Sequence, residues 1–304
     1  GAEILARHLV RIAPPGLARV FYSDDGATAV EVALKMVYQF WRHRGQPQRT
    51  QFISFRLGYH GDTLGAASLA GIDEFRSVFD PILFDVIRPP PLREVGGWER
   101  VFSRVLDELR RRPDEIAGVV VEPLVQGAAG MQVYDAALLR ALREATSEID
   151  TFLIADEVFT GYGRTGSMWA CERAGVAPDL LCMAKGFTAG VLPMAATIAT
   201  PRVYDGFRGG AERAFLHGHT FYGNPLGAAV AREVLAIYRD EQVLAQVARS
   251  ASILEAAFAR LASLPGVLRV RTCGLVGAAD LGDTGYRGEI GWRVHAEARA
   301  RGAF

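Results

Sequence analysis

Two charged residues in this chain stand directly after short apolar runs. Residues 151–155 (TFLIA) lead into Asp156 and Glu157, and residues 180–184 (LLCMA) lead into Lys185 and Gly186. A lysine can form a Schiff base with the aldehyde of pyridoxal phosphate, and a carboxylate can hold the proton on the pyridine nitrogen so that the ring withdraws electrons. The types and positions of Asp156 and Lys185 therefore favour a pyridoxal phosphate site.

Both residues also have ordinary interpretations. A lysine after a strand commonly reaches solvent, and Asp156 with Glu157 could be the carboxylate pair of a hydrolase or a metal site. Neighbouring residues of a strand point to opposite faces, however, so two adjacent acids rarely serve one site. A single carboxylate facing a cationic ring nitrogen fits better, and Gly186 lets a cofactor approach the backbone closely.

A weaker signal for phosphate lies at residues 25–28, where a turn opens a long helix. The free backbone N–H groups of a helix N-terminus bind phosphate, so Gly26, Ala27 and Thr28 are candidate ligands. Taken alone, the segment is better explained as an ordinary helix start. It gains weight only beside a cofactor that carries a phosphate.

Two loops add aromatic and histidine side chains. Tyr59 could stack on a heteroaromatic ring or simply cover the core. Its neighbour His60 is better explained as a structural hydrogen-bonding histidine than as a proton shuttle. His217 and His219 form an HxH pattern without a third ligand nearby, which argues against a metal site. Donation to phosphate is the better functional interpretation of Thr220.

The strands and helices that would position these residues alternate along the chain. Apolar runs predict strands at residues 20–23, 51–55, 118–122, 151–155, 180–184 and 192–200. Periodic or capped segments predict helices at residues 2–13, 27–44, 98–111, 135–148, 224–240 and 241–263. Because the strands are apolar throughout, we expect an α/β fold with a mainly parallel sheet sandwiched by helices. Such sheets bind ligands at the carboxyl ends of their strands, where Asp156 and Lys185 fall.

Pro265 marks a boundary between two predicted domains. We expect a large cofactor-binding domain over residues 1–264 and the start of a small C-terminal α/β domain over residues 265–304, with strands at 268–272 and 275–281. The sequence opens with Gly1 rather than Met and stops directly after a helical pattern. We therefore expect a fragment that lacks both natural ends.

Composition limits the classes of function. Of the 304 residues, 50% are hydrophobic and 22% charged, with 34 basic and 34 acidic side chains and a formal net charge of +0. This balance argues against nucleic acid as a partner, and no apolar stretch approaches the ~20 residues of a membrane span. The 3 cysteines lack disulfide or metal spacing, which is typical of free thiols in a reducing compartment such as the cytoplasm.

Together and in this order, the motifs resemble those of class III aminotransferases, which are pyridoxal phosphate enzymes of fold type I. The strongest part is LIADEVFTGYGRTG at residues 153–166, followed by APDLLCMAKG at 177–186. GYHGDTLGA at 58–66, AVEVALKM at 29–36 and HGHTF at 217–221 extend the resemblance over essentially the whole chain. The resemblance implies a seven-stranded, mainly parallel sheet and a homodimer with its active site at the subunit interface.

The resemblance also implies a role for each matching residue. Lys185 would carry the cofactor and move the proton, and Asp156 would pair with the pyridinium nitrogen. Further cofactor contacts would come from Val158 and Tyr59 on the two ring faces, Glu122 and Gln126 at the ring and its O3′, Gly26 and Ala27 at the phosphate, and His219 and Thr220 of the neighbouring subunit. The substrate would meet Tyr59, Arg164, Lys185 and Gly218. Ala27 stands where several relatives carry serine, so Thr28 is an alternative hydroxyl, and His219 stands where some relatives carry proline.

The activity that the resemblance implies is transamination. The motifs are most similar to those of members that transfer an amino group from S-adenosylmethionine or lysine to 8-amino-7-oxononanoate, giving 7,8-diaminononanoate in biotin biosynthesis. Three alternatives stay open. They are another ω-aminotransferase that uses ω-amino acids or diamines with pyruvate, an aminomutase or racemase on the same scaffold, and a truncated chain without catalysis.

Overall fold

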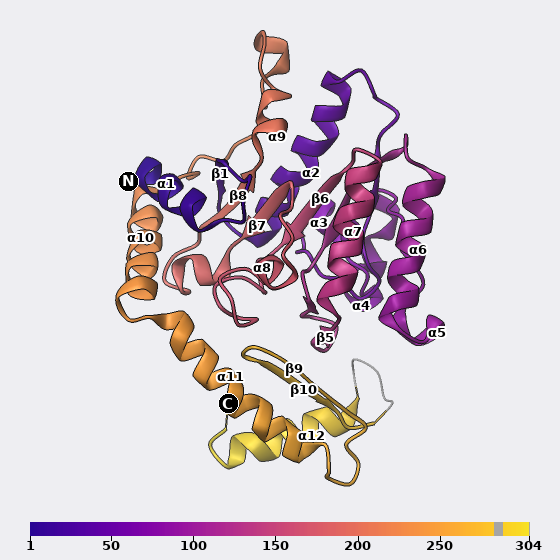
Figure 1. Ribbon diagram of the computed structural model, residues 1–304, viewed down its shortest axis with the longest axis vertical. Coiled ribbons are helices and arrows are strands. Elements are labelled where there is room, and N and C mark those ends of the chain that lie inside the picture. Colours follow the sequence, from indigo (N-terminus) through magenta and orange to yellow (C-terminus); the bar gives the residue numbers. More distant parts are fainter. Residues whose placement is uncertain (283–287, 304) are drawn as a thin grey trace.

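The computed structural model of the chain describes residues 1–282 and 288–303. Its centre is a six-stranded sheet in the order β1-β8-β7-β6-β3-β2 (Figure 1). The strands are β1 (Arg19–Ser23), β2 (Gln51–Ile53), β3 (Ile116–Val121), β6 (Phe152–Asp156), β7 (Leu180–Met183) and β8 (Ala195–Ala199). β8 runs antiparallel to both of its neighbours, and the other adjacent strands are parallel. The mainly parallel α/β sheet expected from the sequence is confirmed.

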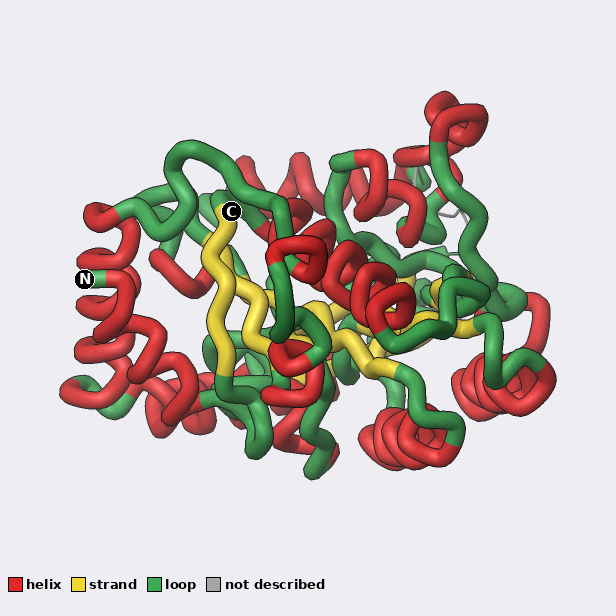
Figure 2. The backbone as a smooth tube through the Cα atoms, turned by 90° about the horizontal axis from the view of Figure 1, so that it is seen from above, coloured by secondary structure: helices red, strands yellow, loops and turns green. Residues whose placement is uncertain are grey.

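Helices lie on both sides of this sheet, as the view from above shows (Figure 2). The longer ones are α1 (Ala2–Ile12), α2 (Gly26–His43), α6 (Trp98–Arg111), α7 (Ala136–Glu148), α10 (Pro225–Asp240), α11 (Val243–Leu261) and α12 (Glu289–Ala300). Short helical segments are α3 (Leu64–Leu69), α4 (Asp73–Arg76), α5 (Leu92–Val95), α8 (Ala170–Ala174), α9 (Pro201–Asp205), η1 (Ser77–Ile82), η2 (Lys185–Thr188) and η3 (Ala211–Arg213). Within the described residues, no helix is long and apolar enough to cross a membrane.

The seventh strand that the resemblance implied is absent from this sheet among the described residues. Beyond β2 the chain makes a single parallel bridge, between Ile53 and Ile87. The nearby residues 89–91 are three consecutive prolines, and proline lacks the N–H group that a strand ladder needs. Pairing at this edge of the sheet is therefore limited to one bridge.

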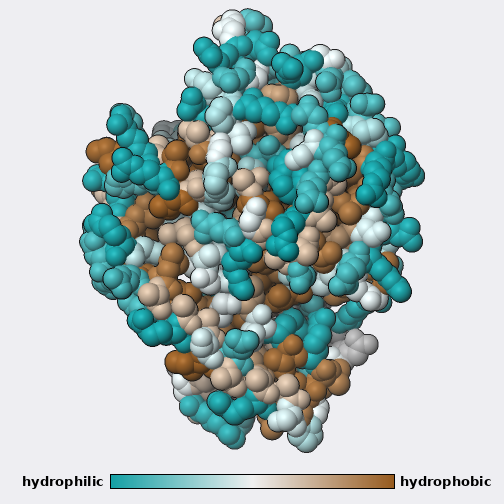
Figure 3. All heavy atoms as spheres, viewed as in Figure 1, coloured by the Kyte–Doolittle hydropathy of each residue, from teal (hydrophilic) through white to brown (hydrophobic). Residues whose placement is uncertain are grey.

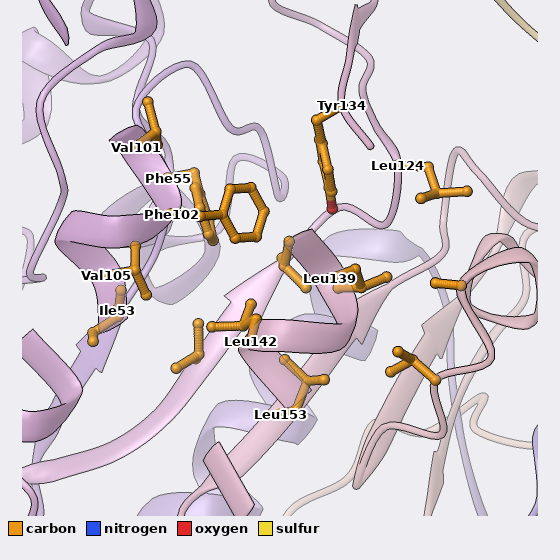
Figure 4. Close-up of a cluster of buried hydrophobic side chains, with 14 of the residues drawn as sticks. Ile53, Phe55, Val101, Phe102, Val105, Leu124, Tyr134, Leu139, Leu142 and Leu153 are labelled. Atoms are coloured by element: carbon orange, nitrogen blue, oxygen red, sulfur yellow. The ribbon is translucent and has the colours of Figure 1, made fainter. Parts of the chain in front are cut away.

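Alternation of side chains along the strands builds separate cores on the two faces of the sheet. Leu153 packs in a cluster with α6 and α7 (Figure 4), whereas its neighbour Ile154 packs in a cluster with α2. In β7, Cys182 belongs to the α2 cluster, and Leu181 packs with residues of α1 and α10. All residues of β3, β6 and β7 are buried, as expected for strands covered on both faces.

The C-terminal elements form a second group below the main sheet in Figure 1. β9 (Arg269–Cys273) and β10 (Val276–Asp280) pair as an antiparallel hairpin, and α11 packs against both strands. Ile253, Leu268 and Trp292 are exposed here, and Figure 3 shows hydrophobic residues among hydrophilic ones at this end of the molecule. The predicted division of the chain at residue 265 stays a prediction. A third, small sheet joins β4 (Val125–Gln126) to β5 (Gln132–Val133).

Candidate active site

The segments that adjoin the six strands of the main sheet meet at one end of the strands. The parallel strands finish at this end, and the antiparallel β8 begins there. A cavity of about 1020 Å³ opens at this end of the sheet. Its lining includes Asp24 to Ala27 after β1, Tyr59 to Thr63 after β2, Glu122, Gly127, Ala128 and Met131 after β3, Asp156, Val158 and Phe159 at the end of β6, Ala184, Lys185 and Thr188 after β7, and Val191 to Met194 before β8. Asp156 and Lys185 thus share one cavity.

Lys185 begins η2 with a left-handed backbone, at φ 48°. A residue other than glycine pays about 1 kcal/mol or more for this conformation, so the surrounding structure must hold it. Its Nζ lies 5.5 Å from the centroid of the Phe159 ring, which is within range of a cation–π contact. Over the described residues Lys185 makes no ion pair and no hydrogen bond through Nζ, so its amine is available for chemistry.

Asp156 is buried and held by two hydrogen bonds. Its Oδ2 lies 2.7 Å from Nδ1 of His60, and its Oδ1 accepts from the backbone N–H of Val158 at 3.1 Å. Burial alone would lower the pKa of His60, but its hydrogen bond to Asp156 and the charge of that carboxylate outweigh burial, so the pKa of His60 is raised. The His60 imidazole and the Val158 N–H therefore hold the Asp156 carboxylate in one orientation.

Glu157 points away from the cavity, as the strand alternation predicted. Its carboxylate accepts from the backbone N–H groups of Ala170 and Cys171 at the start of α8 and from the hydroxyl of Thr160. Burial raises the pKa of Glu157. The two adjacent acids consequently have different surroundings, and only Asp156 lines the cavity.

Glu122 is a second buried carboxylate in the cavity wall. Its Oε1 accepts from the N–H of Tyr59 at 2.9 Å, and its Oε2 accepts from the N–H of Gly127 at 2.8 Å. Burial raises the pKa of Glu122 to about 7, and the charge of His60 opposes that rise. Three ionisable side chains, those of His60, Glu122 and Asp156, therefore line the same cavity.

Replacing Glu122 by glutamine is expected to change how stability depends on pH. The pKa of Glu122 rises from 4.5 to about 7 on folding. Its contribution to the free energy of unfolding is therefore complete below pH 4.5 and is lost as the pH rises through about 7. The full change is about 3 kcal/mol. Denaturant titrations across this range should show the free energy of unfolding of wild type falling relative to that of the variant. A difference that does not vary with pH would contradict this assignment.

The N-terminus of α2 presents free donors to the cavity. Asp25 caps the helix by accepting from the N–H of Thr28 at 2.9 Å, and the Thr28 hydroxyl donates back to the Asp25 carbonyl at 2.8 Å. The N–H groups of Gly26 and Ala27 are left without intrahelical partners, and both residues line the cavity. Thr28 itself serves the cap and is absent from the lining, a role that an acid three residues before a threonine at a helix start could have indicated.

Several candidates from the sequence lie outside this cavity. Arg164 is exposed, and its carbonyl accepts from Leu275. Gly218 and Thr220 are exposed, and His219 pairs with Asp24 at 2.9 Å. Gln126 is buried next to the cavity-lining Gly127 but is not part of the lining. Within this single chain, the structure therefore brings together Lys185, Asp156, Tyr59, Glu122, Val158, Gly26 and Ala27.

The sequence interpretation missed part of the cavity wall. Phe159 and Met131 contribute apolar surface, and Asp62 accepts a hydrogen bond from the Tyr59 hydroxyl at 2.7 Å. Phe159 follows Asp156 by three residues, and its place just past a strand end is a signal that could have found it. For Met131, which lies in a loop between two short strands, the sequence carries no comparable signal.

Comparison with known proteins defines the class of this chain. Residues 2–304 match the family model described as aminotransferase class-III. The chain belongs to the class III aminotransferase family.

Among curated relatives, two proteins named adenosylmethionine-8-amino-7-oxononanoate aminotransferase are similar over essentially the whole chain. The one from Geobacter sulfurreducens is 45% identical, covering 100% of this chain and 71% of that protein. The one from Nitratidesulfovibrio vulgaris is 43% identical, covering 99% of this chain and 59% of that protein. A crystal structure of the enzyme of that name from Methanocaldococcus jannaschii superimposes with a TM-score of 0.92 at 35% identity, over 100% of this chain and 71% of that one.

Proposed function

We propose that the protein containing this chain is a pyridoxal phosphate-dependent aminotransferase, which moves an amino group from a donor amine to a carbonyl acceptor. The observation that carries this proposal is the cavity shared by Lys185 and Asp156, which come from the ends of two adjacent parallel strands. Membership of the class III aminotransferase family supports it.

The residues around the cavity fit this cofactor. The free N–H groups of Gly26 and Ala27 suit its phosphate, and the carboxylate of Asp156 suits its pyridine nitrogen. Tyr59 and Val158 come from separate loops and supply surfaces for a flat ring. Gln126 also fits a bound cofactor. It is buried next to the lining residue Gly127, and its Oε1 has no hydrogen-bond partner in the described part of the chain.

When bound, pyridoxal phosphate supplies an aldehyde that joins amines and a ring that withdraws electrons from the carbon bearing the amine. Lys185 is the one amine among the described lining residues, so we assign to it the attachment of the cofactor. When it is not bonded to the cofactor, its Nζ would take the proton from the carbon that bears the amine and deliver it to the cofactor carbon that carried the aldehyde. His60 and the Val158 N–H hold Asp156 so that its carboxylate keeps one orientation throughout.

For the substrates, we propose 8-amino-7-oxononanoate as acceptor and S-adenosylmethionine or lysine as donor, with 7,8-diaminononanoate as the product in biotin biosynthesis. Four relatives that carry this acceptor in their names are 37–45% identical over nearly the whole chain. Met131, Phe159, Val191 and Leu192 give the cavity an apolar wall, which suits the alkyl chain of this acceptor.

We also propose a cytoplasmic homodimer, in which Gly218, His219 and Thr220 of the partner subunit complete the cofactor site. Large apolar side chains near these residues are exposed, with Leu216 at 89% and Phe221 at 71%. Burial of such side chains favours association. Light scattering should give twice the mass of one chain, and a hybrid of Lys185→Ala and Thr220→Ala subunits should regain activity that neither homodimer has. A monomer with full activity would contradict this arrangement.

The first test of the proposed reaction follows the visible absorbance of the bound cofactor in the full-length protein. Adding 7,8-diaminononanoate should convert the aldehyde form of the cofactor to its amine form in wild type and leave Lys185→Ala unchanged. A response to β-alanine, taurine or 4-aminobutyrate in place of this diamine would keep the aminotransferase and remove the biotin-pathway substrate. No response to any amine would contradict amino transfer.

The attachment of the cofactor can be tested without turnover. Lys35 and Lys185 are the two lysines of this sequence. Lys35 lies outside the cavity, with its Nζ 3.0 Å from Nδ1 of His217. Borohydride reduction of the loaded protein should add the mass of the cofactor to the peptide that contains Lys185 and not to the peptide that contains Lys35. Modification of Lys35, or of neither, would contradict the assignment of Lys185.

Replacing Gly26 by alanine is expected to weaken cofactor binding about tenfold, the order of effect produced by overpacking. An added Cβ at Gly26 would lie 2.7 Å from Cγ1 of Val158, so Val158 must move within the cavity wall. Titration of the protein with pyridoxal phosphate measures the effect. Gly291→Ala is the control, because a Cβ there meets nothing within 4 Å. Equal affinities for all three proteins would show that the wall accommodates the methyl group.

A further inference from the structure

We propose that Glu122 is a positioning residue that joins two walls of the cavity. One wall is the loop at residues 58–63 after β2, and the other is the segment at residues 124–131 after β3. The carboxylate of Glu122 accepts from Tyr59 in the first wall and from Gly127 in the second, at 2.9 and 2.8 Å. Through these bonds it would fix how far the Tyr59 ring stands from the opposite wall.

The burial of Glu122 makes these two bonds important. Glu122 is 5% exposed, so water cannot readily take its place as acceptor for either backbone N–H if the carboxylate is lost. A buried backbone N–H without a partner is costly, and its segment must move to find another acceptor. In the described part of the chain, the backbone–backbone hydrogen bonds of residues 58–63 go to residues 55, 67 and 71 of the same segment and not to residues 124–131.

The rest of the chain anchors Glu122 firmly enough to serve as a bridge. Its own backbone carbonyl accepts from the hydroxyl of Tyr134 at 2.7 Å, and Tyr134 packs among the buried side chains in Figure 4. Gly127 in turn lies against the Phe159 ring, where an added Cβ would come within 2.9 Å of a ring atom. Displacement of residues 124–131 would therefore also disturb the ring that faces Lys185.

The chain supplies a matched control in Glu157. It is likewise buried and accepts from two backbone N–H groups, those of Ala170 and Cys171, but it lies outside the cavity. Glutamine at either position keeps the shape of the side chain and replaces one accepting oxygen by a donor. The two variants thus remove the same kind of interaction from different places.

Amide hydrogen exchange on the full-length protein tests the bridge independently of catalysis. In Glu122→Gln, protection of Tyr59, Gly127 or both should fall by about tenfold or more, while that of Ala170 and Cys171 stays unchanged. Glu157→Gln should give the reverse. Unchanged protection at both Tyr59 and Gly127 in Glu122→Gln, or an equal loss there in Glu157→Gln, would overturn the proposal.

Kinetics supply a second measurement, which rests on the proposed function. Glu122→Gln should raise KM for the amine substrate at least about threefold, because the Tyr59 wall is no longer fixed, whereas Glu157→Gln should leave KM unchanged. If Glu122→Gln does not fold, Glu122→Asp keeps the charge but is too short to reach both loops, and the same exchange pattern is expected. If Glu122→Gln loses protection but the wild-type protein transfers no amino group, the bridge stands and the proposed function is rejected.

Discussion

Replacing Lys185 by alanine is expected to lower kcat for amino transfer by about 10³-fold or more. No second amine among the described residues lines the cavity, so nothing there can take over attachment of the cofactor or proton transfer at the reacting carbon. Steady-state kinetics with the preferred amine, together with circular dichroism to show that the fold is intact, measure this effect.

Lys185→Arg separates charge from proton transfer. Arginine keeps a cation near the Phe159 ring but remains protonated at any working pH, so it cannot act as a base. We therefore expect the arginine variant to be as inactive as the alanine variant. If the arginine variant kept a tenth or more of wild-type kcat, Lys185 would act only through its charge, and the proposed proton transfer would be wrong.

Replacing Asp156 by asparagine is expected to lower kcat by about 10² to 10³-fold, the range typical of losing one preorganised electrostatic group. The amide has nearly the same shape but no charge, so it cannot stabilise a proton on the neighbouring ring nitrogen. It also leaves His60 without its carboxylate partner, and the pKa of His60, now dominated by burial, should fall. Kinetics and the proton resonances of His60 report these two effects separately.

Glu157→Gln is the control for Asp156→Asn because it replaces the neighbouring buried acid, which directly follows β6 and lies outside the cavity. Both substitutions should lower thermal stability, since each removes a buried acceptor of hydrogen bonds. Only Asp156→Asn should lower kcat. Unchanged kinetics in Asp156→Asn would remove the ring-nitrogen role, and an equal loss in Glu157→Gln would mean that both variants act through stability.

Local patterns in the sequence were enough to predict most elements and the residues at their ends. Apolar runs located the strands, and the change from apolar to charged residues located Asp156 and Lys185. The helix predicted from residue 224 is α10, and Asn224 caps it by accepting from the N–H of Leu226 at 2.9 Å. These features depend on residues that are close in the chain, so a single sequence can indicate them.

Contacts between distant segments were not predictable in the same way. His60 and Asp156 are 96 positions apart, and Tyr59 and Glu122 are 63 apart. No spacing rule connects such pairs before the sheet order is known. The prediction of a seventh strand was wrong for a different reason. The resemblance implied this strand, but the prolines after Ile87 limit pairing there to one bridge. Arg164 lies in the motif at residues 153–166, but the direction of its side chain depends on the turn that holds it.

The opposite orientations of Asp156 and Glu157 make this protein more sensitive to the length of β6 than to many changes of residue type within it. Deleting one residue inside the strand would bring Glu157 to the position of Asp156, whereas inserting one would bring Ala155 there, because each side chain would move to the other face of the sheet. After a deletion the cavity would still contain a carboxylate, but the longer side chain of Glu157 would not meet His60 as Asp156 does, and after an insertion this position would have no carboxylate. Insertions engineered into this protein should therefore be confined to the loops that flank the strand.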